Sequence, residues 1–138
     1  MSLYGYKKKW RLRPDLRDKP VQVNAPKRAR PRSRRMSKLM AYYHHVVKPA
    51  YLLDEPWCKV HGRGCRADQV HHTRGRAGTL LIDRRFFAGV CSGGHSYCEE
   101  QKSLARADGL LCERGLWNHA PKDAETRRLK LLVIELTK

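Results

Sequence analysis

Residues 70–98 read VHHTRGRAGTLLIDRRFFAGVCSGGHSYC. This segment holds a pair of histidines, a loop rich in arginine and glycine, and a Cys-x3-His before a polar stretch. Residues 79–82 and 86–90 are apolar and mostly β-prone, which predicts strands. Gly93 and Gly94 predict a turn into a helix over residues 95–104. The segment therefore predicts a small α+β unit that gathers cysteine and histidine.

The two adjacent histidines, His71 and His72, fall within a predicted short strand over residues 67–72. Successive residues on a strand point to opposite sides, so the two imidazoles cannot easily bind one ion. We expect one histidine to hold a metal and the other to act as a base, since a neutral imidazole can take a proton from water. His95 is a further candidate ligand. A structural role for the pair is the alternative.

Four cysteines form two pairs with the same spacing: Cys58 with Cys65, and Cys91 with Cys98. Four thiolates brought together would make a closed tetrahedral zinc site. His61 forms a Cys-x2-His with Cys58 and competes with Cys65 as a ligand. Buried cysteines that only fill space are the other interpretation.

Basic residues are concentrated at the start of the 138-residue chain. Lys and Arg number 30 against 13 acidic residues, a formal net charge of +17, and residues 1–50 hold 15 of the basic residues with only two Asp. This excess predicts a polyanion as the partner. Residues 1–35 also contain four prolines and few apolar residues, which predicts an extended or disordered arm lying along phosphates. Its candidate contacts include Arg28, Arg30, Arg32, Arg34 and Arg35; a solvated tail or a nuclear-import signal are rival interpretations.

The remaining segments are assigned by pattern and composition. Residues 37–52 carry the apolar stripe of an amphipathic helix that Pro49 can kink, and residues 119–138 contain a final helix or edge strand. We expect the arm at 1–35, a central domain at 36–118 and the final element at 119–138. No apolar run has the length of a membrane span, and the odd cysteine count without a secretory signal predicts a cytoplasmic location, in a bacterial host cell if the chain is phage-encoded.

From about residue 51 to residue 111, the order of motifs resembles the HNH endonucleases, also called His-Me finger or ββα-metal nucleases. The similarity is greatest to small phage-type members with a zinc knuckle. It covers the Trp-Cys knuckle, VHHTRGRAG, TLLID, FFAGVC, GGH and the helix before LARADGLL. The resemblance implies a ββα-metal core with flanking helices.

The resemblance also implies roles for individual residues. His71 and His95 match the ligands of a catalytic divalent ion, usually Mg²⁺, and His72 matches the general base that activates water. Cys58, Cys65 and Cys91 match structural zinc positions. Arg74 and Arg76 are candidate phosphate contacts, because a guanidinium can bind two phosphate oxygens, or they are simply exposed charges.

The sequence departs from the family pattern at two places. Gly94 stands where a second cysteine is common, so Cys98 or His61 would have to supply the fourth zinc ligand. The Asn that orients the base is also missing: its approximate position falls at Arg85 or Phe86, with Asp83 as the nearest polar acceptor. A backbone carbonyl could hold the base instead.

These observations favour a metal-dependent endonuclease that cuts or nicks DNA, with RNA as a possible substrate and with salt-sensitive affinity supplied by the arm. A non-catalytic, zinc-stabilised nucleic-acid-binding module is the first alternative. A structural or assembly protein of a phage-like particle is the second. His72 discriminates between them, because a binding module does not need a neutral imidazole there.

Overall fold

The computed structural model describes residues 29–138. Arg28 and most of the predicted arm therefore lie outside the described residues. Arg30 and Arg32 lie in a segment without helix or strand, whereas Arg34 and Arg35 are exposed residues of the first helix. The part of the chain from Arg32 to Lys138 forms one compact unit. None of the helices among residues 29–138 is both long and apolar enough to span a membrane.

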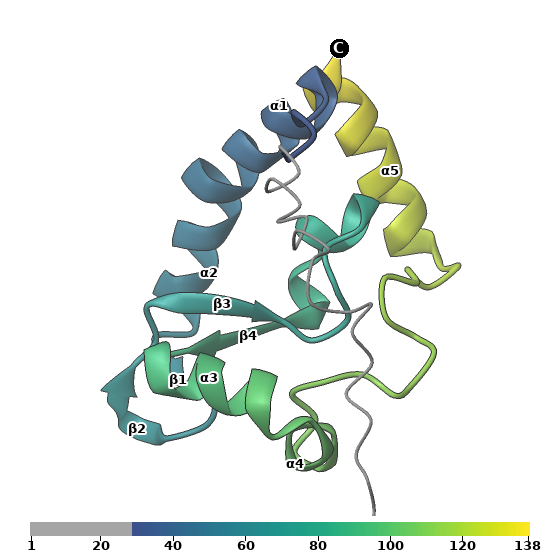
Figure 1. The fold of residues 1–138 in the computed structure, drawn as a ribbon. Coiled ribbons are helices and arrows are strands. Elements are labelled where there is room, and N and C mark those ends of the chain that lie inside the picture. Colours follow the sequence, from purple (N-terminus) through teal and green to yellow (C-terminus); the bar gives the residue numbers. More distant parts are fainter. Residues whose placement is uncertain (1–28) are drawn as a thin grey trace, which may run out of the picture. The chain divides into compact units, whose positions relative to one another are not determined.

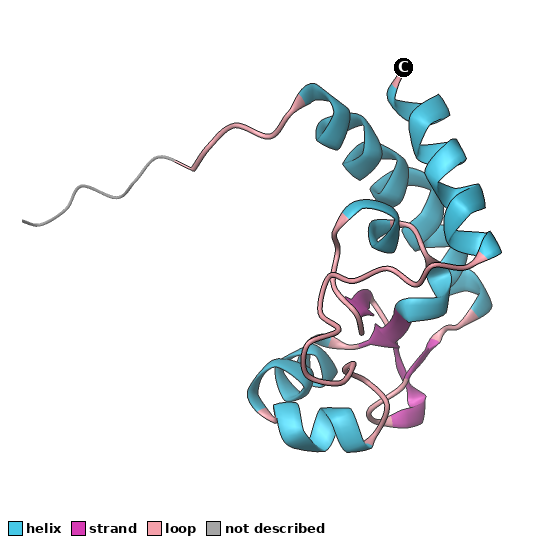
Figure 2. Cartoon of the chain, turned by 90° about the vertical axis from the view of Figure 1, so that its right-hand side faces the viewer, coloured by secondary structure: helices cyan, strands magenta, loops and turns pink. Residues whose placement is uncertain are grey.

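This unit is α+β, as predicted, and combines helices with two small sheets (Figure 1, Figure 2). Its elements in chain order are α1 (Arg34–Tyr42), the π-helical segment η2 (Tyr43–Val47), α2 (Lys48–Asp54), β1 (Trp57–Cys58), β2 (Gly62–Arg66), β3 (Gln69–His72), the 3-10 segments η3 (Gly78–Leu81) and η4 (Arg84–Phe86), β4 (Phe87–Val90), α3 (Ser92–Glu100), α4 (Lys102–Ala107) and α5 (Ala124–Thr137).

The antiparallel hairpin β3–β4 lies between two layers of helices (Figure 1). Its register pairs His71 with Ala88 and His72 with Phe87. Because directly opposed residues share a face, the two pairs point to opposite sides of the hairpin. Ala88 packs with the helices that follow the hairpin, whereas Phe87 packs with α1, η2 and α2. The two histidines are therefore separated onto two faces, as strand alternation predicts.

The long amphipathic helix is present, but it is interrupted. It begins at Arg34 with Ser33 as its N-cap, and a π-helical segment lies directly before Pro49. Proline has no N–H and its ring clashes with a carbonyl of the preceding turn, which explains the wider turn there. Its buried residues recur every four positions, at Leu39, Tyr43, Val47 and Tyr51. A four-residue repeat drifts around an α-helix of 3.6 residues per turn, and the wide turn offsets that drift.

Two local predictions were wrong. Residues 79–82 were predicted to form a strand but lie mostly in the 3-10 segment η3, where Leu80 and Leu81 are fully buried. A short apolar run indicates that a segment is buried, but it does not show whether the segment is a strand or a helix. The helix predicted over residues 95–104 begins at Ser92, ends at Glu100, and is followed by the separate helix α4. Gly93 and Gly94 therefore belong to the first turn of α3 instead of preceding it.

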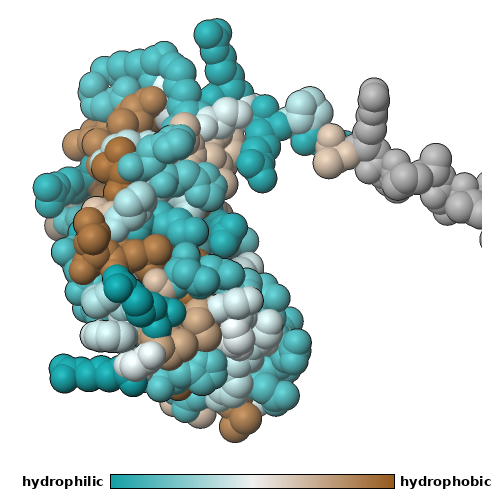
Figure 3. All heavy atoms as spheres, turned by 90° about the vertical axis from the view of Figure 1, so that its left-hand side faces the viewer, coloured by the Kyte–Doolittle hydropathy of each residue, from teal (hydrophilic) through white to brown (hydrophobic). Residues whose placement is uncertain are grey.

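The final segment is the helix α5, which settles the choice left open between helix and strand. Asp123 caps it by accepting from the Thr126 N–H at 2.8 Å. Its Val133 packs in the core formed by α1, α2 and the hairpin, and Figure 1 shows the end of α5 beside the start of α1. The face in Figure 3 is mostly hydrophilic, with separate hydrophobic patches.

A buried carboxylate ties this final helix to the segment before β4. Asp83 is 2% exposed, and Arg85 donates to both its carboxylate oxygens, at 2.9 and 2.7 Å. Arg85 also donates to Asp123 at 2.9 Å. The guanidinium therefore joins η4 to the N-terminus of α5 through two carboxylates.

We expect Arg85→Ala to lower the free energy of unfolding by about 2–3 kcal/mol, because it leaves the Asp83 carboxylate buried without its partner. This expected loss of stability is smaller than the cost of breaking a fully buried ion pair, because 40% of the Arg85 side chain is exposed. Arg84→Ala is the matched control: its pair with Asp54 is exposed on both sides, so the loss should stay below about 1 kcal/mol. Urea denaturation measures both. Equal losses in the two variants would contradict the prediction.

Candidate functional site

Three cysteines and one histidine converge where the pair of strands β1 and β2 meets the start of α3. They are Cys58 from β1, His61 from the turn between β1 and β2, Cys65 from β2 and Cys91 from the N-cap of α3. Their ligand atoms all lie within 4.8 Å of one another. Cys58 Sγ is 3.6 Å from His61 Nδ1 and 3.8 Å from Cys91 Sγ, and Cys65 Sγ is 3.9 Å from His61 Nδ1. A tetrahedral zinc with Zn–S bonds of about 2.3 Å has edges of about 3.8 Å. The cluster could therefore hold a metal such as zinc.

The electrostatics of the cluster suit a cation. Burial raises the pKa of Cys58, but the backbone N–H groups of Cys91, His61 and Val60, together with the Cys91 thiol, outweigh it and lower that pKa to about 6. A second thiolate beside the first is disfavoured: hydrogen bonding to Cys91, with the nearby sulfur charges, raises the pKa of Cys65 to about 11. A divalent ion would remove this repulsion between thiolates.

The fourth member of the cluster is His61, not Cys98. Cys98 lies two turns along α3, is 1% exposed, and packs with Ala88, Ala105 and Leu110. At 1.5 Å per residue, the seven positions after Cys91 carry it about 10 Å along the helix, too far for a shared ion. Of the two candidates for the fourth ligand, His61 therefore lies within the cluster and Cys98 does not.

Gly94 allows α3 to approach the cluster. A Cβ at this position would lie 3.0 Å from Cys58 Sγ and 3.3 Å from Val60 Cγ2. The helix could not sit so close to the sulfur with a larger residue there. This explains why glycine stands where the related pattern has a second cysteine: the space for that side chain is taken by the thiol of Cys58.

His71 faces α3 and lies beside His95. Their ring centroids are 5.6 Å apart in an edge-to-face arrangement. Nε2 of His71 lies 3.0 Å from the Leu110 carbonyl, to which it donates, so Nδ1 is left as the acceptor nitrogen. Burial, and then the charge of His95, lower the pKa of His71, which keeps the imidazole neutral. The structure thus brings together the two predicted ligands of a catalytic ion, and the carbonyl fixes one of them as metal-binding histidines usually are.

His72 faces the opposite layer and is 3% exposed, with its ring against Tyr43 and Phe87. Nε2 lies 3.4 Å from the Leu81 carbonyl, and Nδ1 accepts from Arg76 Nε at 3.2 Å. These two partners assign a neutral imidazole protonated on Nε2. Burial, followed by the charge of Arg76, lowers the pKa of His72 to about 4.

The carbonyl of Leu81 is the acceptor that Nε2 of His72 faces. Asp83, the nearest polar acceptor in the sequence, is instead bound to Arg85. The geometry thus agrees with the alternative in which a backbone carbonyl holds the imidazole of His72.

The two arginines of the loop differ in what they contact. Arg74 donates to the His119 carbonyl at 2.6 Å and lies over the Phe86 ring, so its guanidinium is already engaged with protein. Arg76 is exposed, and within residues 29–138 the one hydrogen bond of its side chain is the contact with His72. Of the two, Arg76 is better placed to receive a phosphate.

Asn118 organises this arginine loop from more than 40 positions away in the sequence. Its Oδ1 accepts from the N–H groups of Arg76 and Ala77 at 3.0 and 3.3 Å, and its own N–H donates to the Arg74 carbonyl at 2.8 Å. Its φ is 62°, a conformation that asparagine tolerates. Residue 75 also has to be glycine, because a Cβ there would lie 2.1 Å from Asn118 Oδ1. The only sequence signal was an asparagine next to a glycine- and proline-containing turn region.

We expect Asn118→Gly to speed amide exchange at Arg76 and Ala77 by roughly fivefold, because each loses a hydrogen bond contributing about 1 kcal/mol. Glycine keeps the positive φ, so the backbone itself is not strained. Hydrogen exchange resolved by residue measures the effect. Asn118→Asp is the control, since it retains the accepting Oδ1 and should retain protection. Unchanged exchange in the glycine variant would show that the loop does not depend on this side chain.

Comparison of the chain with protein-family models, with curated proteins and with solved structures finds no match. The resemblance to HNH nucleases therefore rests on the order of the motifs in the sequence.

Proposed function

We propose that this protein is a metal-dependent endonuclease of the HNH kind that hydrolyses phosphodiester bonds in DNA, at the site formed by His71, His72 and His95. The observation that supports it most directly is the state of His72. Its Nε2–H is held by a carbonyl and its Nδ1 lone pair faces an exposed arginine. A histidine kept neutral, oriented and in reach of a cationic side chain is the arrangement that a general base for phosphate chemistry requires.

His71 and His95 would hold the divalent ion of this proposal. Two imidazoles leave the remaining coordination positions open for substrate and water, as catalytic sites require. When bound, such an ion stabilises negative charge on the phosphate and on the leaving oxygen. Mg²⁺ prefers oxygen ligands, whereas imidazole suits transition metals, so the donor set favours ions such as Mn²⁺, Ni²⁺ or Zn²⁺ over Mg²⁺.

Arg76 connects the substrate to the base. Its guanidinium can bind two phosphate oxygens, which are stronger acceptors than a neutral imidazole. When a phosphate draws Arg76 away, Nδ1 of His72 loses its donor and becomes free to take a proton from water. Because His72 is almost fully buried at rest, this displacement is also what opens a path to it. The base is thus exposed only where a phosphate is already bound.

The proposal is tested by plasmid cleavage with purified protein, in parallel reactions containing Mg²⁺, Mn²⁺, Ni²⁺ or no added divalent ion. Nicking or linearisation that requires an added ion, and that is lost in His71→Ala, supports it. Binding without cleavage under every ion would favour the alternative, a non-catalytic nucleic-acid-binding module stabilised by the cluster of Cys58, His61, Cys65 and Cys91. That alternative is supported by the metal-binding geometry of the cluster, which does not depend on the three histidines.

A further inference from the structure

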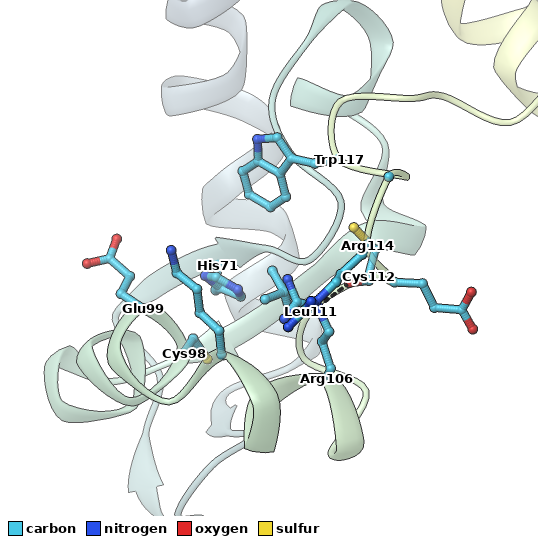
Figure 4. A pocket seen from close by; sticks show the side chains of 11 residues that line it. His71, Cys98, Glu99, Arg106, Leu111, Cys112, Arg114 and Trp117 are labelled. Carbon is cyan, nitrogen blue, oxygen red and sulfur yellow. Dashed lines mark hydrogen bonds between the residues drawn. The ribbon is translucent and has the colours of Figure 1, made fainter.

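A pocket of about 660 Å³ opens beside His71, on the side of the hairpin covered by α3 and α4 (Figure 4). Its walls come from β3, from both helices, and from the loop that follows α4. This volume lies in the range of sites that enclose a small molecule, about 300–1,000 Å³. The pocket shares His71 with the proposed catalytic site, so whatever fills it would lie next to the reacting phosphate.

The most prominent side chain of the pocket is Trp117. It is 49% exposed, and in Figure 4 its indole points toward the side of the pocket that holds His71 and Leu111. A half-exposed tryptophan at the mouth of a cavity presents a flat apolar face to a ligand, and ordering its side chain costs little conformational entropy. Leu111 and the buried Cys98 supply apolar surface on the walls.

The pocket also carries an excess of positive charge. Lys102, Arg106 and Arg114 line it against two acidic residues, Glu99 and Glu113. Arg106 is positioned by a hydrogen bond from its Nε to the Cys112 carbonyl at 3.1 Å, which leaves its terminal nitrogens for a ligand. An aromatic face combined with cations suits a ligand that has both a flat ring and a phosphate.

The loop that carries Trp117 is attached to β3 and to the segment that follows it at three points. The Leu110 carbonyl accepts from His71 at 3.0 Å, the Cys112 N–H donates to the Thr73 carbonyl at 2.8 Å, and Asn118 bonds the arginine loop as described above. These bonds fix the position of the pocket relative to β3 before any ligand binds. A preformed site next to His71 can set the register of a strand at the cleavage point.

We propose that this pocket receives a single unpaired nucleobase of the substrate strand, stacked on Trp117, with the flanking phosphates on Lys102, Arg106 and Arg114. This inference deepens the proposed function, because it names the substrate class: DNA with an unpaired nucleotide beside the scissile phosphate, such as a bulge or a single-stranded junction. A base inside a duplex is covered on both faces by its neighbours and cannot enter a pocket unless it leaves the stack.

The inference is tested by binding rather than by cleavage. Fluorescence anisotropy compares a short duplex with the same duplex carrying a one-nucleotide bulge, in buffer without added divalent ions. We expect the bulged duplex to bind at least about fivefold more tightly, the effect of stacking one base on an aromatic residue. Trp117→Ala should remove that difference while leaving affinity for the plain duplex nearly unchanged. Trp57→Ala is the matched control, because Trp57 is 42% exposed but lies outside the pocket.

A second measurement reports stacking directly and keeps the native pocket. The chain has three tryptophans, and a variant with Trp10→Phe and Trp57→Phe leaves only Trp117. Its fluorescence should be quenched by the bulged duplex and not by the plain one. Equal affinity for the two duplexes, no quenching, or quenching only by free thymidine monophosphate would overturn the inference. Loss of cleavage with a retained bulge preference would count against the nuclease proposal alone, and cleavage without any bulge preference would count against the pocket alone.

Discussion

His72→Gln should reduce DNA cleavage by about 10²–10⁴-fold, the contribution of a positioned general base, while DNA affinity stays within about twofold. Glutamine can still donate to the Leu81 carbonyl, which His72 Nε2 contacts at 3.4 Å, but it has no basic nitrogen. The substitution therefore removes proton transfer and keeps the hydrogen bond that orients the side chain. Single-turnover cleavage and anisotropy on the same DNA measure the two quantities. Equal loss of cleavage and affinity would mean that His72 supports the fold or the binding surface instead.

His45→Gln is the matched control, because His45 is exposed in η2. It should cleave as the unaltered protein does. The pH dependence provides a further check. Since burial and Arg76 hold the pKa of His72 near 4, its imidazole is neutral throughout the neutral range. In the free protein, the imidazole resonances of His72 should therefore not titrate as the pH falls from 8 to 6. Resonances that titrate across this range would contradict the assigned state of His72.

Removing the metal from the Cys58, His61, Cys65 and Cys91 cluster should lower the melting temperature by at least about 10 °C. Structural zinc contributes about 10–16 kcal/mol to the folding of zinc-finger peptides, and even a fraction of that is large for a unit of this size. The cluster joins β1, β2 and the start of α3, so its loss frees the segment that positions the hairpin. Thermal unfolding with and without a chelator, alongside the zinc content per chain, measures the effect.

Two substitutions sharpen this test by separating the candidate ligands. His61→Ala should lower the zinc content, whereas Cys98→Ala should keep it at one ion per chain, because the thiol of Cys98 packs in a hydrophobic cluster. Cys112→Ser, outside the cluster, should also keep the ion. Zinc retained in His61→Ala and lost in Cys98→Ala would mean that the fourth ligand is Cys98. Protein that holds no zinc and melts unchanged with chelator would contradict the site altogether.

The sequence by itself determined the features that depend on local periodicity and spacing. Alternation along a strand places His71 and His72 on opposite faces of the hairpin, and the register bears this out. The apolar stripe of residues 37–52 likewise marks the helix that covers one face. Such features depend on residues that are close together in the sequence, which is why a sequence pattern is sufficient to predict them.

Only the tertiary structure decided which distant groups meet. His61 rather than Cys98 completes the cluster because α3 begins at Ser92, three positions earlier than the glycines suggest, which carries Cys98 two turns away. The Leu81 carbonyl beside His72 depends on how a buried apolar run folds, here as a 3-10 turn. Asn118 accepts a hydrogen bond from Arg76 in the arginine loop, 42 positions away in the chain. Contacts of this kind follow from the packing of whole elements, and no local pattern in the sequence encodes them.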